Sequence, residues 1–160
     1  MTSFDIVINS FLSKITDDMY MELTVAETND MVQDLLINAI PYFEFPRISL
    51  EYDLDNRCFL YKLNNEEINI ISTYMIVEWL SVQLANVDLV RQMYGGKDFA
   101  LTSQANHMSK LNNLKIHYTE LGFHLQRLYG RRRPDTNGIY RSTMCELMTK
   151  NPSFKWGDER

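Results

Sequence analysis

Residues 64–95 read NNEEINIISTYMIVEWLSVQLANVDLVRQMYG, and this stretch decides the fold. Asn64 and Asn65 are good helix caps, Glu66 and Glu67 favour the positive end of a helix dipole, and Gly95 with Gly96 ends the run. Between Ile68 and Met93 most residues are apolar, and the only charged ones are Glu78, Asp88 and Arg91. We therefore predict one long helix from residues 66 to 94 that is apolar on nearly every side.

A helix that is apolar all round must be covered all round. One interpretation places this helix in the core of a monomer. The other holds that three further helices in a small domain cannot cover it, so that part of it meets another subunit. The second interpretation assigns the subunit interface to Tyr74, Trp79 and Val82.

Two amphipathic segments precede this helix. Apolar residues at steps of three and four predict a helix over residues 4–15. A second helix is expected from Thr24, with Glu27 completing a capping box, to Ile40, because Pro41 removes a donor and disfavours helix in the residue before it. Between residues 47 and 63, two short strand-like runs flank the turn-forming Asp53-Leu54-Asp55-Asn56 and predict a β-hairpin.

A last long helix is expected from Ala105 to Tyr129, after a polar connection at 97–104, with Gly130 as a left-handed C-terminal cap. Residues 131–138 are expected to break regular structure, and Ser142 to Met148 form one short candidate helix. We thus predict a mainly α fold, a four-helix-type bundle with a small β-hairpin and an extended C-terminal tail. The domain spans residues 1–133 and the docking tail residues 134–160.

Composition sets further limits. The 160 residues suit a single domain, and the net charge of −5 gives the whole chain no electrostatic reason to bind nucleic acid or an anionic membrane. Acidic residues predominate in residues 1–67 and basic residues in residues 68–160. One interpretation is that copies of the chain contact one another head to tail. The other is that the uneven charge lies on solvated faces and has no function. Cys58 and Cys145 are isolated, which favours a reducing compartment, and no signal peptide or membrane span is expected.

Two clusters are candidate functional sites. His117, Glu120 and His124 share one helical face, so they are either joint ligands of a divalent metal or histidines with structural roles. The second cluster is basic and contains Arg127, Arg131, Arg132 and Arg133. It either binds a protein partner, or binds DNA phosphates, or is a solvated helix end favoured by the helix dipole. No catalytic, cofactor or metal site is predicted, since the glycine-rich and nucleophile motifs are absent from the sequence.

The order of these elements resembles the head-to-tail connector adaptors, or neck proteins, of tailed bacteriophages. The resemblance covers residues 4–133 and includes Ile76-Val77-Glu78-Trp79-Leu80, Lys110-Leu111-Asn112-Asn113-Leu114 and the helix end Leu128-Tyr129-Gly130-Arg131-Arg132-Arg133. It implies a virion protein that needs no active site. Its copies, about a dozen, would form a ring beneath the portal protein, in the neck at the head-tail interface, after assembly in the host cytoplasm.

The resemblance also implies the partners. They are the portal protein, downstream neck or tail proteins, and double-stranded DNA that passes through the channel during genome packaging without sequence-specific binding; no membrane is involved. The residues expected to bind the portal or another partner are Arg131, Arg132, Arg133, Tyr140, Phe154 and Trp156. The alternatives from other classes are a small helical metal-dependent enzyme and an intracellular module that binds an acidic partner through its arginines.

Overall fold

The structure is a computed structural model that describes residues 1–15, 25–94, 101–134 and 140–142. This described part is mainly helical, and four α-helices carry most of it: α1 (Phe4–Leu12), α2 (Val25–Ala39), α3 (Asn65–Tyr94) and α4 (Leu101–Arg131). A short 3₁₀ helix, η2 (Ile40–Tyr42), follows α2. The helical content agrees with the sequence prediction.

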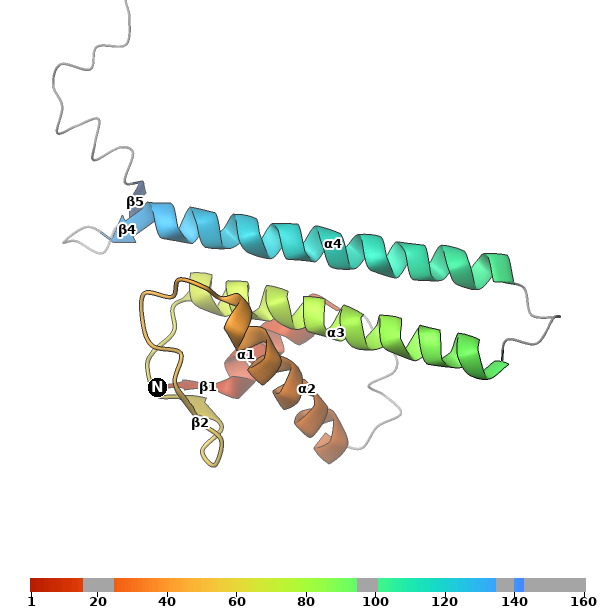
Figure 1. Cartoon of the computed structure of the whole chain (residues 1–160). Coiled ribbons are helices and arrows are strands. Elements are labelled where there is room, and N and C mark those ends of the chain that lie inside the picture. Colours follow the sequence, from red (N-terminus) through yellow and green to blue (C-terminus); the bar gives the residue numbers. More distant parts are fainter. Residues whose placement is uncertain (16–24, 95–100, 135–139, 143–160) are drawn as a thin grey trace, which may run out of the picture.

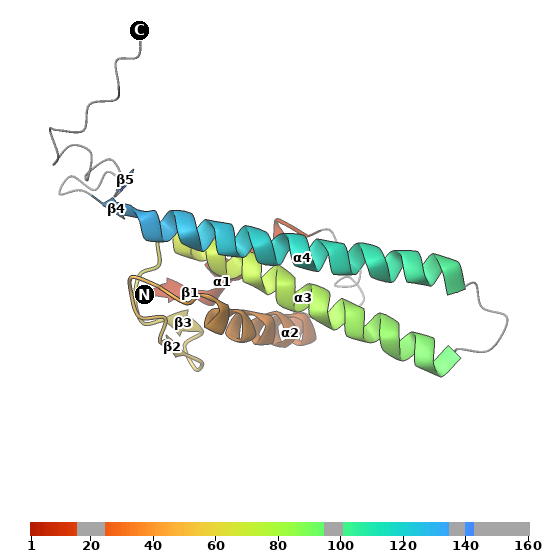
Figure 2. The same ribbon diagram turned by 45° about the horizontal axis from the view of Figure 1, so that its top comes forward.

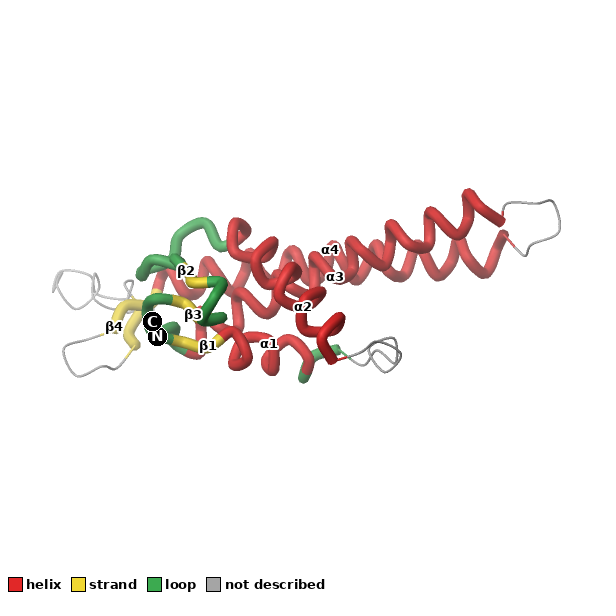
Figure 3. Tube along the Cα trace, turned by 90° about the horizontal axis from the view of Figure 1, so that it is seen from below, coloured by secondary structure: helices red, strands yellow, loops and turns green. Residues whose placement is uncertain are grey.

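The helices form layers around α3. Helices α1 and α2 cover one side of its first half, and α4 runs antiparallel along its other side (Figure 1, and Figure 2 in a second orientation). The C-terminal part of α3 and the N-terminal part of α4 extend together beyond α1 and α2 (Figure 3). The core therefore lies at one end of the α3–α4 pair.

Helix α1 forms where the sequence predicts it, although it ends at Leu12 and not at residue 15. The Ser3 hydroxyl accepts a hydrogen bond from the Asp5 amide and caps the first turn. The apolar stripe Phe4, Val7, Ile8 and Phe11 is buried in the core. Burial of this stripe holds α1 against α3.

The start of α3 is fixed by a reciprocal capping box. The Glu67 amide donates to Asn64 Oδ1 (2.9 Å), and the Asn64 amide donates to Glu67 Oε2 (2.8 Å). For α2, the predicted capping residue Thr24 lies outside the described residues, whereas the predicted end before Pro41 is confirmed at Ala39.

Burial along α3 decreases toward its C-terminal half. Residues Ile70 to Val77 are all buried, Trp79 is half-buried, and Val82 is 41% exposed. Among the described side chains of α3, the expectation of cover on every side therefore holds from Ile70 to Val77, where α1, α2 and α4 surround the helix, and fails at Val82.

A small three-stranded antiparallel sheet closes the end of the core. Its order is β1 (Thr2–Ser3), β3 (Cys58–Phe59) and β2 (Tyr52–Asp53). The β2–β3 hairpin confirms the prediction for residues 47–63, and Asp53 Oδ1 accepts from the Asp55 and Asn56 amides in its turn. The pairing of Thr2 with Phe59 was not predicted.

The end of α4 differs from the prediction. The helix begins at Leu101 and continues through Gly130 to Arg131, so the expected connection at 101–104 and the left-handed cap at Gly130 are wrong. Two backbone carbonyls at this end, those of Tyr129 and Arg132, accept from the Arg47 guanidinium instead, which replaces a glycine cap.

A second hairpin follows α4. Strand β4 (Arg132–Pro134) pairs with β5 (Tyr140–Ser142), so the prediction of irregular structure from residue 131 and of a helix beginning at Ser142 is wrong. Residues 143–148 of that expected helix lie outside the described part of the chain.

One segment of α3, Asn65–Asn86, is long and apolar enough to cross a membrane by length and composition alone. Half of its most apolar window is buried inside the structure, and the core helix of a soluble protein meets the same criteria.

Candidate functional site

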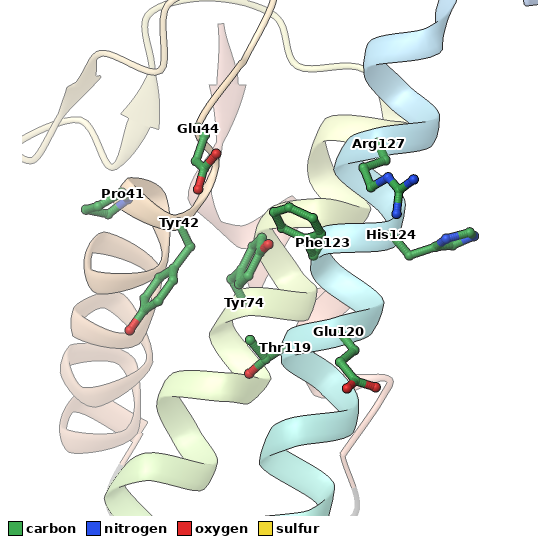
Figure 4. Close-up of a pocket in the computed structure, with 9 residues that line it drawn as sticks. All are labelled: Pro41, Tyr42, Glu44, Tyr74, Thr119, Glu120, Phe123, His124 and Arg127. Atoms are coloured by element: carbon green, nitrogen blue, oxygen red, sulfur yellow. The ribbon is translucent and has the colours of Figure 1, made fainter.

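A groove in the described structure lies between η2 with the loop after it and helix α4. Its volume is about 630 Å³, which falls in the range of ligand and peptide sites. Figure 4 shows the lining side chains: Pro41, Tyr42, Glu44, Tyr74, Thr119, Glu120, Phe123, His124 and Arg127.

Two stacked tyrosines form the base of this groove. The rings of Tyr42 and Tyr74 lie 5.3 Å apart and are inclined by only 13°. Tyr74 contacts α4 at Gly122, where an added Cβ would lie 2.7 Å from Tyr74 Cζ. A glycine is therefore required for α4 to approach the ring this closely.

Gln126 fixes the same tyrosines from α4. Its side-chain amide donates to the Tyr42 carbonyl (2.8 Å) and to the Tyr74 hydroxyl (2.5 Å). Its Oε1 accepts from the Glu44 amide (3.0 Å). One residue of α4 thus binds both sides of the groove, which makes the groove preorganised.

The polar groups of the groove have mixed charge. The Tyr42 hydroxyl donates to Glu78 Oε1 (2.7 Å), and this hydrogen bond, with burial, raises the Tyr42 pKa. Burial also raises the Tyr74 pKa. The lining also contains two acids, Glu44 and Glu120, and two basic residues, His124 and Arg127. Phe123 is 53% exposed. This arrangement offers a contact surface with an aromatic centre.

A second cluster joins the end of α4 to the start of α3. The Tyr129 hydroxyl donates to Glu67 Oε1 and accepts from the Arg47 amide (3.0 Å). The Arg47 guanidinium lies 3.9 Å from the centroid of the Tyr129 ring. Burial and the Glu67 carboxylate raise the Tyr129 pKa, so the hydroxyl stays protonated and donates to the buried acid. The cluster is structural because its groups satisfy one another.

Lys14 forms a third polar cluster, at the end of α1. Its Nζ donates to Ser72 Oγ (2.7 Å), Asn69 Oδ1 (2.8 Å) and Thr73 Oγ1 (3.3 Å), all on α3. These partners are neutral, and burial lowers the Lys14 pKa to about 8. These hydrogen bonds join the segment that follows α1 to α3.

The predicted metal-binding alternative is not assembled in the described part of the chain. His117, Glu120 and His124 lie on the exposed side of α4. Among the described residues, no three His, Cys, Asp or Glu side chains come close enough to hold a metal ion. The His117 ring instead contacts the Tyr118 ring edge to face.

The structure describes only some of the residues expected to bind the portal. Arg131 is exposed at the end of α4, but Arg132 forms a salt bridge with Glu66 (2.9 Å) within the chain. Arg133 pairs with Arg141, and Pro134 with Tyr140, in the β4–β5 hairpin. Phe154 and Trp156 lie outside the described residues.

One residue of the expected subunit interface is buried within the chain. Tyr74 is buried inside the chain, because Tyr42 and α4 cover it, so the expectation that it contacts another subunit is wrong. Trp79 packs against the core and is half-buried, and Val82 remains exposed. Further exposed apolar residues on α4 were not predicted: Leu114, Ile116 and Phe123.

The groove itself was not predicted from the sequence. It joins residues from η2 and α4 that lie about 80 positions apart, such as Tyr42 and Gln126. The one local signal was Gly122, a glycine inside a helical pattern, which often marks a close approach. Comparison with known protein families, with curated proteins and with solved structures finds no match for this chain.

Proposed function

We propose that this chain is a structural virion protein, a head-to-tail connector adaptor that forms a ring beneath the portal of a tailed bacteriophage. The proposal rests on the resemblance described above and on one structural observation, the set of apolar side chains left exposed on the paired long helices. A protein of this kind acts through contacts and needs no catalytic centre.

The exposed side chains are Val82 on α3 and Leu114, Ile116 and Phe123 on α4, with exposures from 41% to 53%. They lie on the helices that extend beyond α1 and α2 (Figure 3). Ile116 and Phe123 are seven residues apart and therefore share one face of α4. Exposed apolar side chains on a shared face are typical of protein–protein interfaces. In the proposed ring this surface is covered by neighbouring subunits.

The finer architecture belongs to the same proposal. The helices would act as a four-helix bundle that supplies the wall of the ring, and residues 134–160 as the docking tail for the portal. The channel enclosed by the ring would let double-stranded DNA pass without sequence-specific binding.

The test is a measurement of mass for the full chain, alone and after incubation with purified portal protein. We expect a closed oligomer of defined stoichiometry, either in the free protein or once the portal is present. A chain that remains monomeric with the portal, and that does not attach to portal-bearing capsids, would overturn the proposal.

A matched pair of variants tests the role of the exposed residues. Phe123→Ser should prevent or weaken oligomer formation, because it removes an exposed aromatic side chain from the contact surface. Leu54→Ser, which alters an equally exposed side chain in the hairpin turn, should leave the mass unchanged. Equal effects of the two substitutions would contradict the assignment of the surface to the long helices.

A further inference from the structure

The outward face of α4 is basic. Lys110, His117, His124 and Arg131 recur every seven residues and are all exposed, so they form one stripe along the helix. Arg127 lies next to this stripe, and Glu120 is the one exposed acid on α4 among the described side chains. Ile116 and Phe123 add exposed apolar area along its edge.

The outward face of α2 is acidic. The sequence of α2 contains three acids and no lysine or arginine. Asp30 and Asp34 are exposed and four residues apart, so their carboxylates point from the same side of the helix. Arg127 and Arg131 are also four residues apart on α4. The two pairs therefore have the same spacing and opposite charge.

The α2 and α4 faces cannot meet within one copy of the chain. Helix α3 lies between the two helices (Figures 1 and 2). Asp30 and Asp34 are exposed on the side of α2 opposite its buried Val32 and Leu36. A contact between them needs two copies. Because each copy then retains one free face, the contact is head-to-tail and extends to a ring or a filament.

We propose that the outward face of α4 in one copy docks on the outward face of α2 in the next, with Arg127 and Arg131 against Asp30 and Asp34. This inference rests on the proposed ring function and names the surfaces that build it. The partner is a second copy of this chain, selected by charge complementarity. Ile116 and Phe123 supply apolar area at the edge of the same contact.

Charge reversal on each face provides the test. Variant one carries Arg127→Glu with Arg131→Glu, and variant two carries Asp30→Lys with Asp34→Lys. Each variant alone should associate at least about tenfold more weakly than the original chain, because like charges then face each other. Circular dichroism should remain unchanged, since all four side chains are exposed on helices.

Recovery of assembly when opposite charges are paired again is the decisive measurement. An equimolar mixture of the two variants should assemble, because each reversed face finds an opposite charge on the other variant. A chain that carries all four substitutions should also assemble with itself. Lys62→Glu, which changes an exposed lysine outside both faces, should have a much smaller effect than the equal charge change Arg127→Glu.

The outcomes separate the two proposals. If the original chain forms its oligomer and the reversed variants form it equally well, the α4–α2 contact is wrong while the ring remains. If no oligomer forms with the portal, both proposals fail. If variant one loses binding to a double-stranded DNA fragment but keeps its mass, the α4 face is a nucleic-acid surface and the proposed contact is overturned.

Discussion

The Tyr74 ring occupies the space that a side chain at position 122 would fill. An ideal Cβ on Gly122 would lie 2.7 Å from Tyr74 Cζ and 2.9 Å from Cε1, well inside van der Waals contact. The ring is not free to move, because it stacks on Tyr42 and its hydroxyl accepts from Gln126. The close packing of α3 and α4 beside the groove depends on this glycine.

Gly122→Ala is therefore expected to destabilise the chain, although alanine favours a helix more than glycine does. Overpacking of this kind costs about 1–3 kcal/mol. Gly130→Ala is the matched control, because it changes the same residue type in the same helix where nothing lies within 4 Å of the added Cβ. That substitution should stabilise by about 0.5–1 kcal/mol. Urea unfolding measures both free energies.

Tyr74→Leu should partly rescue Gly122→Ala, since leucine lacks the ring atoms that the new Cβ would meet. The double variant should then lose less stability than the two single losses added together. Strict additivity would show that the clash is relieved elsewhere and that the ring does not set the distance between the helices.

Lys14 makes stability depend on pH. Its pKa is lowered from 10.5 to about 8 in the folded chain, so the unfolded chain binds more protons between these values. The free energy of unfolding should therefore rise as the pH increases from 8 toward 10, and the cost of burying the charged amine should be fully present below pH 8. Above pH 10, the raised pKa values of Tyr42, Tyr74 and Tyr129 oppose this trend.

Lys14→Met should remove this rise, while Lys62→Met, at an exposed lysine, should retain it. Ser72 and Thr73 keep their hydrogen bonds to the Asn69 carbonyl in the variant, so they are not left without partners. Urea unfolding at pH 7.5 and 9.5 gives the comparison. An unchanged rise in Lys14→Met would mean that another group causes it.

Tyr129→Phe should destabilise the chain by about 1–3 kcal/mol, the usual cost of leaving a buried polar group unsatisfied. The lost hydroxyl donates to the buried Glu67 carboxylate and accepts from the Arg47 amide. Tyr61→Phe, at a tyrosine that is half exposed, is the control and should have little effect. If the two substitutions have the same effect on thermal unfolding, the Tyr129 hydroxyl does not stabilise the buried Glu67 carboxylate.

Asn64→Ala should cost about 1 kcal/mol, because the Glu67 amide loses its capping acceptor. Asn65→Ala tests the neighbouring asparagine, which is exposed and lies inside the helix. The free energies of unfolding of the two variants, measured by chemical denaturation, should differ by most of that amount. Equal losses would show that the capping box does not define the start of α3.

Local patterns predicted much of the fold. The cap at Asn64, the stop before Pro41 and the turn at Asp53 depend on nearby residues, and each lies where the sequence indicates. Strand β1 was missed because two residues contain no alternating pattern. Gly130 was misread because Arg47, which lies far away in sequence, supplies the hydrogen bonds that a left-handed glycine would have provided.

The candidate site was harder to predict for the same reason. The arginine cluster is visible in the sequence, but the salt bridge that occupies Arg132 comes from Glu66 on another helix. Tyr74 belongs to a helix that is apolar on nearly every side, so its sequence does not indicate which side another element covers. In the structure, Tyr42 from η2 stacks on the Tyr74 ring. Such contacts depend on the tertiary arrangement and leave no local pattern.

Helix α4 is held at its C-terminal end, so a small rotation there displaces its N-terminal end by a larger distance. Its 31 residues span about 46 Å at 1.5 Å per residue, and Arg47, Tyr129 and Arg132 fix the end next to the core. A tilt of about 5° at that end would displace the opposite tip by about 4 Å over this length. Small changes at the groove or at the Arg47 contact are therefore amplified where the long helices extend farthest from the core.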